Sequence, residues 1–263
     1  MYAFNFERPS ALAQAVSHLQ AGGQALAGGQ TLLASMKQRL LAPELLVDLG
    51  ALPELQGVCQ DGDHLVIGAM TRHQDVASNA LVRQHLPGLA ALANGIGDKQ
   101  IRAMGTLGGS VANNDPAACY PSALLALGAT VVTNQRSIAA EDFFQGLYST
   151  ALEPGELIVA IRFPLAQRTA YAKFKQSASR FALVGVFVAQ TQAGVRVAIT
   201  GAGNGVFRHA GLEAALTQSF TPEAVAQVAI DASDLNGDLH ASADYRAHLI
   251  TVQTQRAVRL ALA

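Results

Sequence analysis

The sequence predicts an α+β fold of three successive parts, and three of its patterns indicate this. The first part alternates helical and strand patterns around a turn with paired glycines. The middle mixes strands and helices around a second glycine turn, and the last third places three strands in a row before three helical patterns. A chain of 263 residues is long enough for two or three small domains. We therefore expect boundaries that give segments 1–55, 56–166 and 167–263.

The first segment contains a small βαβ-like unit. Ser10 is a candidate cap for a helix that extends to Leu19, because apolar residues recur between them at helical spacing. A short strand is predicted over residues 25–27, just before the first glycine turn. A helical pattern over 32–41 and a buried strand over 45–49 complete the unit.

The middle segment mixes strands and helices around the second glycine turn. One of its strands carries apolar residues on both faces and is expected to end at Pro164. The predicted strands are 65–68, 129–133 and 156–163, and the predicted helices are 86–96 and 122–128.

The final segment is predicted to form a separate α+β module. Its alternating and apolar runs over residues 170–175, 181–189 and 195–200 indicate three strands in a meander. This order favours a small antiparallel sheet with helices on one side. The helical patterns that follow cover 211–216, 222–232 and 243–262.

Composition and charge exclude several classes of protein. Only 14% of the residues are charged and the formal net charge is −1, which disfavours nucleic acid as a partner because its binding proteins present a basic face. No apolar run approaches the ~20 residues of a membrane span, and the N-terminus lacks the pattern of a signal peptide. With only Cys59 and Cys119, the chain has neither a disulfide framework nor a metal–cysteine cluster. We expect a cytoplasmic protein.

Two glycine-paired turns are the most specific local feature of the chain. Residues 26–33 are L-A-G-G-Q-T-L-L, and residues 106–110 are T-L-G-G-S. Glycine permits positive φ and lets main-chain N–H groups approach a ligand closely, and a run of such groups can hold an anion. A pyrophosphate gripped from both sides, as in a dinucleotide cofactor, is the natural ligand. No Lys or Arg lies within residues 22–35, so the first turn would offer the phosphates neutral donors.

Other candidate motifs are weaker. Residues 201–206 look like a dinucleotide-binding fingerprint, but Val206 occupies the third glycine position, so a tight turn is the better interpretation. The seven histidines are scattered without the spacing of metal ligands. Phosphate-loop, nucleophile-elbow and zinc-protease sequences are also missing.

The stretch around the second glycine turn indicates a family. Residues 96–121 are IGDKQIRAMGTLGGSVANNDPAACYP, and residues 27–31 are AGGQT. Both resemble the flavin-binding turns of the FAD-binding medium subunit in the xanthine dehydrogenase and carbon monoxide dehydrogenase family of molybdenum hydroxylases. Residues 174–180 and 245–257 are similar to segments of that family's C-terminal domain. The resemblance covers essentially the whole chain and does not distinguish between substrates.

The resemblance implies a fold and a set of cofactor contacts. The first two segments would form a two-part FAD-binding domain of the vanillyl-alcohol-oxidase/PCMH-like type, followed by a C-terminal domain with a three-stranded antiparallel sheet and helices. Ile96 matches an apolar residue against the cofactor, and Ile158 matches an adenine-side contact. The other implied contacts are Leu26, Ala27, Gly28, Gly29, Gln30, Thr31, Leu32, Leu33, Thr106, Leu107, Gly108, Gly109, Ser110, Cys119 and Lys175.

Lys175 has a specific role in this resemblance. It matches a lysine that approaches the isoalloxazine, where a cation favours the anionic reduced flavin. A solvated lysine on an edge strand is the alternative interpretation.

Three positions depart from the family pattern. Cys119 stands where an aspartate usually bonds the cofactor, and a thiol is a poor acceptor. Asp115 is a candidate substitute, although it is equally suited to cap the turn before Pro116. Ser110 replaces an Asn or Asp, and Gln30 stands where some relatives have His or Thr.

The implied function is electron transfer within a larger enzyme. FAD in this chain would take electrons from a [2Fe–2S] cluster on a small partner subunit and pass them to an external acceptor. A large subunit with a molybdenum–pterin cofactor would carry out the hydroxylation, in a dimer of heterotrimers. The chain itself needs no catalytic acid or base and no metal ligand. Two other classes stay open: a stand-alone flavin oxidase or reductase of the same fold group, and a scaffold subunit without flavin.

Overall fold

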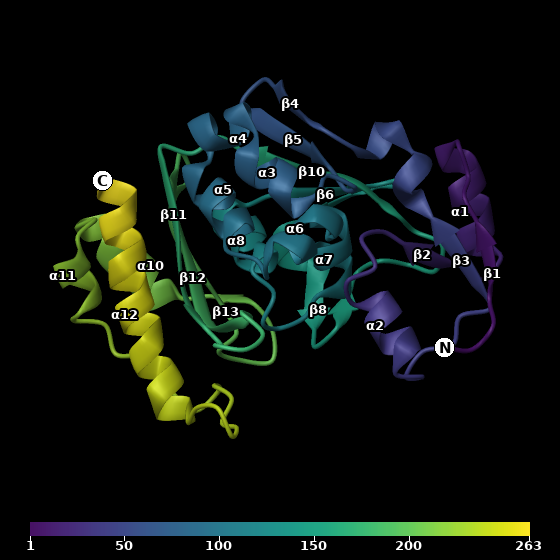
Figure 1. The fold of residues 1–263 in the computed structure, drawn as a ribbon. Coiled ribbons are helices and arrows are strands. Elements are labelled where there is room, and N and C mark those ends of the chain that lie inside the picture. The colour runs from purple at the N-terminus through teal and green to yellow at the C-terminus, as the bar shows by residue number, and fades with distance from the viewer.

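The computed structural model describes residues 1–263 and contains three main sheets that follow one another along the molecule (Figure 1). The first is parallel, in the order β1-β3-β2. Helices connect its strands, because parallel neighbours need a crossover connection. The bounds are β1 Asn5–Glu7, α1 Leu12–Gln20, β2 Gln24–Leu26, α2 Leu32–Lys37 and β3 Leu45–Asp48.

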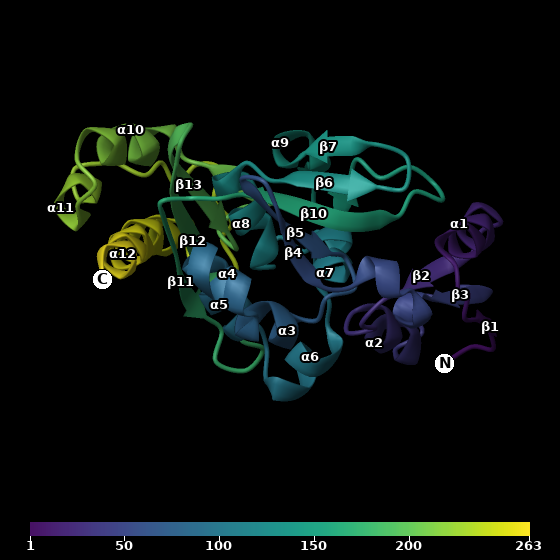
Figure 2. The same ribbon diagram turned by 90° about the horizontal axis from the view of Figure 1, so that it is seen from above.

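The second sheet is antiparallel, in the order β4-β5-β10-β6-β7. Strand β10 lies at its centre, in keeping with its apolar residues on both faces. Figure 2 shows most of the helices of this part on one side of the sheet, with one short helix beside β7 at its edge. The strands are β4 Val58–Asp61, β5 His64–Gly68, β6 Thr130–Thr133, β7 Ser137–Ala139 and β10 Ile158–Pro164, with a separate hairpin of β8 Phe144–Gly146 and β9 Ser149–Thr150.

Seven helices accompany the second sheet. Two of them, α5 and α8, pack against the third sheet as well as against their own core. The helices are α3 His73–Ser78, α4 Ala80–His85, α5 Pro87–Asn94, α6 Lys99–Met104, α7 Leu107–Asn113, α8 Tyr120–Leu127 and α9 Ala140–Phe143, and two short 3-10 turns, Leu49–Ala51 and Pro53–Leu55, precede the sheet.

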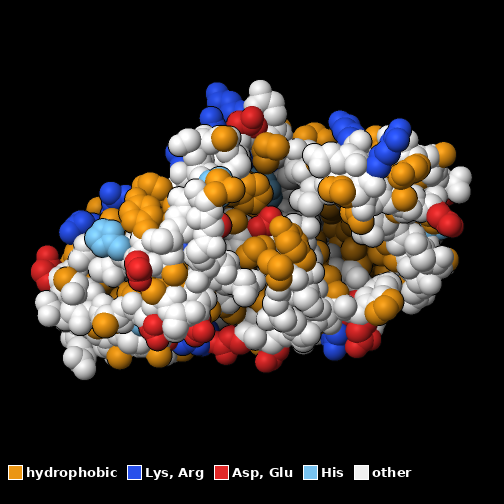
Figure 3. All heavy atoms as spheres, turned by 90° about the horizontal axis from the view of Figure 1, so that it is seen from below, with side chains coloured by type: hydrophobic (Ala, Val, Ile, Leu, Met, Phe, Trp, Pro, Cys, Tyr) orange, Lys and Arg blue, Asp and Glu red, His pale blue; other side chains and the backbone are white.

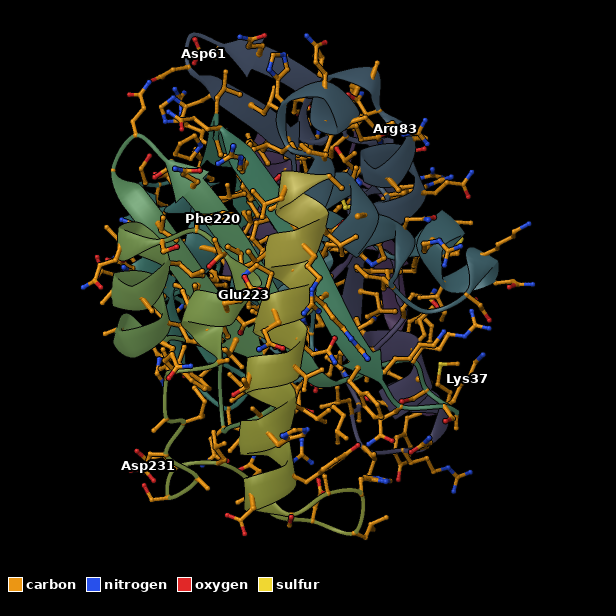
Figure 4. All side chains as sticks on the ribbon, turned by 90° about the vertical axis from the view of Figure 1, so that its left-hand side faces the viewer. Lys37, Asp61, Arg83, Phe220, Glu223 and Asp231 are labelled. Atoms are coloured by element: carbon orange, nitrogen blue, oxygen red, sulfur yellow. The ribbon has the colours of Figure 1, made fainter.

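The third sheet is antiparallel, in the order β11-β12-β13-β14. Figure 4 shows α12 lying along its outer face, with the short helix that contains Glu223 beside it. The bounds are β11 Arg168–Lys175, β12 Ala182–Thr191, β13 Gly194–Thr200, β14 Phe207–Arg208, α10 Ala210–Gln218, α11 Pro222–Val225 and α12 Ala243–Leu262.

Two hydrophobic cores share the third sheet. Tyr171 and Phe187 point into the core of the middle segment, together with side chains of α5 and α8. Val186 and Val188, on the opposite face of β12, pack with α12 in the core of the final segment. Apolar residues on both faces of a strand therefore reflect burial on both sides. The middle and final segments are joined by this shared sheet.

The sheets and cores support the segment boundaries that we propose. The strands of the first sheet lie within 1–55, those of the second within 56–166 and those of the third within 167–263. A small third core joins α1 and β3 to the start of the middle segment through Met70 and Leu157.

Six short strands were not expected from the sequence, namely β1, β4, β7, β14 and the two strands of the β8–β9 hairpin. Each lies at the edge of its sheet. An edge strand is often short and half solvated, so it lacks the apolar run that predicts a central strand. The predicted three-stranded sheet of the final segment thus gains β14 as a two-residue addition.

Three helix ends differ from the predicted ones. Ser10 does not cap α1, because Ala11 is the N-cap and the Leu12 N–H donates to Glu54 Oε1 at 3.2 Å. The helix predicted over 32–41 ends at Lys37, where Arg39 takes a φ of 61° and the Leu40 N–H bonds back to the Ser35 carbonyl. This arrangement is a Schellman-type termination with arginine in place of the usual glycine. The helix predicted over 222–232 ends at Val225.

Candidate cofactor-binding site

A cavity of about 560 Å³ opens between the first sheet and the middle segment. Figure 3 shows this hollow from below, with hydrophobic side chains inside it. Both glycine turns, Ala69 and Met70 after β5, the loop before β10 and the β11–β12 loop line it. All three segments of the chain thus contribute to one site of the size that holds a cofactor.

The first glycine turn presents a run of free backbone donors to the cavity. The N–H groups of residues 28–32 donate no hydrogen bond to any other group of the chain, and all five residues line the cavity. Gly29 has a φ of 67°, which a side chain would strain. The run continues into the start of α2. Neutral N–H groups converging at a helix start are suited to a pyrophosphate.

The two glycine turns touch each other. A Cβ atom on Gly28 would clash with the carbonyl oxygen of Met104 and would lie 2.6 Å from the Cα of Gly105. Gly105 in turn lies against the His73 ring, with its own ideal Cβ position 2.6 Å from Nε2. Glycine is therefore required at position 28 for the close approach of the first and middle segments, and at position 105 for packing against His73.

The second glycine turn uses its backbone donors within the fold. The N–H groups of Leu107 and Gly108 donate to the carbonyls of Thr71 and Ala69, at 3.0 and 2.8 Å. The Gly109 N–H donates to the Thr106 hydroxyl, which caps α7. A Cβ on Gly108 would lie 2.9 Å from the Ala69 Cα. The second turn therefore forms a tightly packed part of the cavity wall. The N–H groups without an acceptor in the chain belong to the first turn.

One end of the cavity is formed by the segment that leads into β10. Glu156, Leu157 and Ile158 line it. The Glu156 side chain is fully buried and accepts hydrogen bonds from Thr133 Oγ1 at 2.7 Å and from Arg136 Nε and Nη2 at 3.0 Å. The Arg136 guanidinium lowers the pKa of Glu156 to about 2. This carboxylate fixes the backbone that presents Ile158.

The opposite end is formed by the loop after α5 and by the β11–β12 loop. Ile96, Cys119, Lys173, Arg180 and Phe181 line it. The Lys173 ammonium donates to the Gly95 carbonyl at 2.8 Å, to the Arg180 carbonyl at 2.9 Å and to Cys119 Sγ at 3.5 Å. Three chain segments are therefore tied together by one lysine.

Lys175 lies outside the cavity lining and is exposed to solvent. In a regular strand, Lys173 and Lys175 would share one face. The β11–β12 register shifts between Phe174 and Lys175, so the alternation is broken at that point. Lys173 is thus the lysine of β11 that reaches the cavity.

Most of the residues expected from the sequence come together at this cavity. Leu26 and Leu33 flank the first turn without lining the cavity, and Leu107 is completely buried beneath it. Asp115 also lines the cavity, where its Oδ1 accepts from the Ala117 N–H at 2.8 Å and its Oδ2 accepts from the Tyr148 hydroxyl at 3.3 Å. The expected residues in the lining are Ala27, Gly28, Gly29, Gln30, Thr31, Leu32, Ile96, Thr106, Gly108, Gly109, Ser110, Cys119 and Ile158.

His73 is a cavity residue that sequence reasoning missed. It is 5% exposed, its Nδ1 has no hydrogen-bond partner, and its ring lies 5.4 Å from that of Tyr120. Burial lowers its pKa to about 4, with a further contribution from the charge of Arg102. His73 is therefore neutral at pH 7. A single histidine without a ligand-like neighbour gives no signal in the sequence.

The fold and the unpaired N–H donors of the first turn favour the class of proteins that bind a dinucleotide cofactor. Comparison with known proteins is specific within that class. The family model described as the FAD binding domain in molybdopterin dehydrogenase matches residues 2–166. The chain belongs to this family.

The relatives span the whole chain. The carbon monoxide dehydrogenase medium chain of Hydrogenophaga pseudoflava is 37% identical, over 99% of this chain and 97% of its own length. The solved carbon monoxide dehydrogenase of the same organism superposes with a TM-score of 0.91, over 99% of this chain and 98% of that one. Quinoline 2-oxidoreductase of Pseudomonas putida 86 superposes with a TM-score of 0.89 at 28% identity, over 99% and 97% of the two chains. The names of these relatives include different substrates for the same kind of subunit.

None of the helices combines the length and the apolar character that a transmembrane helix requires.

Proposed function

We propose that this chain is the FAD-carrying subunit of a molybdenum hydroxylase and holds the cofactor along the cavity. The observation that carries this proposal is the run of free N–H donors at residues 28–32, which faces the cavity. The pyrophosphate would lie at this run. The adenine would extend toward Ile158 and the isoalloxazine toward Ile96, Cys119 and Lys173.

The residues of the chain have distinct tasks in this arrangement. FAD supplies the electron-transfer chemistry when bound. The first glycine turn binds the phosphates, Glu156 and Arg136 hold the wall at the adenine end, and Lys173 fixes the wall at the ring end. Phe181 lines the ring end with a side chain that is 47% exposed, so it offers an apolar surface to the cofactor. The chain positions and surrounds the cofactor and needs no acid–base residue of its own.

The partners that we propose are a small [2Fe–2S] subunit and a large molybdenum–pterin subunit, assembled as a dimer of heterotrimers in the cytoplasm. Electrons would pass from the iron–sulfur cluster to FAD and then to an external acceptor. Cys59 and Cys119 are too few to ligate such a cluster in this chain. The match over almost the full length of medium subunits supports a subunit role rather than that of a stand-alone oxidase.

Amide hydrogen exchange tests the proposal at the residues that carry it. The complete chain is purified alone and together with co-expressed partners, and the flavin content and the exchange of residues 28–32 are measured with and without FAD. We expect bound FAD to slow exchange at these residues, because their N–H groups gain acceptors. The turn at residues 201–205, which is glycine-rich but outside the cavity lining, is the matched control and should not change. Unchanged exchange at 28–32 in a flavin-loaded sample would contradict the placement.

A further inference from the structure

Three cations converge on one loop at the ring end of the cavity. Arg102 Nη1 donates to the carbonyls of Ile96 and Gly97 at 2.9 and 3.2 Å, and Arg180 Nη1 donates to the same Gly97 carbonyl at 3.1 Å. Lys173 Nζ donates to the carbonyl of Gly95, two residues earlier. The two guanidinium groups therefore share one oxygen atom, with an ammonium group beside them.

No carboxylate neutralises this cluster. Arg102, Lys173 and Arg180 take part in none of the ion pairs of the structure. The neighbouring Asp98 caps α6, where its Oδ1 accepts from the Ile101 N–H at 2.9 Å. Like charges that are close together repel and produce a positive potential nearby, which a negative charge in a shared low-dielectric space would offset.

The positive potential is directed toward the cavity. Lys173, Arg180 and Gly97 all line it. Arg180 has a φ of 63°, an unfavourable conformation for a residue with a side chain. Its carbonyl accepts from Lys173, and its N–H donates to the Gln176 carbonyl at 2.9 Å. The loop thus holds Arg180 in a strained position against the cavity, which is typical of functional sites.

Arg102 does not line the cavity, but its charge reaches a residue that does. Burial is the main cause of the lowered pKa of His73 in the cavity lining, and the charge of Arg102 adds to it.

We infer that Arg102, Lys173 and Arg180 form an electrostatic site that stabilises the negative charge gained by the flavin ring on reduction, and that Lys175 does not contribute to it. This inference rests on the proposed function. Two electrons from the partner iron–sulfur subunit and one proton from solvent leave the ring with one negative charge. The three cations would favour that state over the neutral oxidised ring.

Substitutions that remove one charge test this site in the FAD-loaded complete chain. The variants are Arg180→Gln and Lys173→Gln, and the matched control is Lys175→Gln, from the same strand. The measurements are the reduction potential of the flavin and its affinity for sulfite, which adds to the ring and leaves a negative charge on it. We expect each variant to lower the affinity for sulfite by roughly tenfold. The same tenfold change in the equilibrium constant for reduction lowers the potential by about 30 mV for a two-electron couple. Lys175→Gln should change neither the affinity nor the potential.

A conservative variant separates charge from structure. Arg180→Lys keeps the charge and should retain most of the wild-type potential, whereas a purely structural role would make it resemble Arg180→Gln. Equal effects of Arg180→Gln and Lys175→Gln, or no effect of either, would overturn the inference. A wild-type chain that binds no FAD, alone or with its partners, would instead contradict the proposed function.

Discussion

At the scale of single residues, the site depends on a few buried polar groups whose charge is set by their surroundings. Glu156 is kept ionised by an arginine, and His73 is kept neutral by burial. They lie in the walls of the same cavity. Because the pKa of each group is shifted by folding, the stability of the protein depends on pH through both residues, in two different pH ranges.

His73 should make the fold less stable as the pH falls from about 6.5 to about 4. In that range the unfolded chain binds a proton at this residue and the folded chain does not, so the free energy of unfolding falls as the pH falls. Denaturant titrations between pH 7 and pH 4 measure this slope. A His73→Gln variant should show a smaller slope, and an identical slope would contradict the assignment.

Glu156 should act at lower pH. Its pKa is depressed from 4.5 to about 2, so its contribution to stability is complete above pH 4.5 and is lost as the pH falls through 2. Glu156→Gln should lower the free energy of unfolding by about 2 kcal/mol at pH 7, because the charge-assisted bonds to Arg136 are lost. Thermal unfolding at pH 7 and pH 3 checks both statements. The variant should differ less from the wild type at the lower pH.

At the scale of elements, the Asn114 side chain makes two of the hydrogen bonds that attach the β8–β9 hairpin to the end of α7. Asn114 is buried, has a φ of 42°, and donates from Nδ2 to the carbonyls of Gly146 and Ser149 at 2.8 and 2.7 Å. Asparagine tolerates this left-handed conformation better than most residues. The same residue thus ends the helix and holds the hairpin.

Replacing Asn114 by alanine should destabilise the protein by about 2–4 kcal/mol, through two lost hydrogen bonds and a strained backbone. Asn114→Gly relieves the strain and should cost less. Hydrogen exchange in residues 144–150 should accelerate in both variants. If Asn114→Gly were as stable as the wild type, the two hydrogen bonds would not be the link that holds the hairpin.

The sequence predicts central elements better than edges and contacts between segments. Apolar periodicity is strong in β10, β12 and α12, and all three were predicted. The unexpected edge strands β1, β4, β7 and β14 have no such pattern. The bulge that separates Lys173 from Lys175 is a property of the pairing with β12, and no local pattern encodes it. The glycine turns were predicted as a pair. Only the structure shows that N–H groups of the second turn donate to the carbonyls of residues 69 and 71.

At the scale of the whole molecule, the final segment supports the FAD-binding part. The family model ends at residue 166, yet α5 and α8 pack against the third sheet beyond it. The β11–β12 loop also closes the ring end of the cavity. A fragment of residues 1–166 would expose an apolar surface that the complete chain buries.

We therefore expect this fragment to aggregate or to bind FAD far more weakly than the complete chain. Expression of both, followed by size-exclusion chromatography and flavin analysis, tests this. Residues 167–263, expressed separately, should also aggregate, because one face of their sheet would lose its cover. A monodisperse fragment of 1–166 with a full complement of flavin would show that the shared sheet is dispensable.

The neutral first turn has a consequence for handling the protein. The pyrophosphate that this turn would hold carries two negative charges, and these would add to the net charge of the chain. The formal net charge of −1 would become roughly −3 on loading. FAD-loaded and FAD-free molecules should then elute at different salt concentrations from an anion-exchange column. The areas of the two peaks would give the fraction of chains that carry FAD.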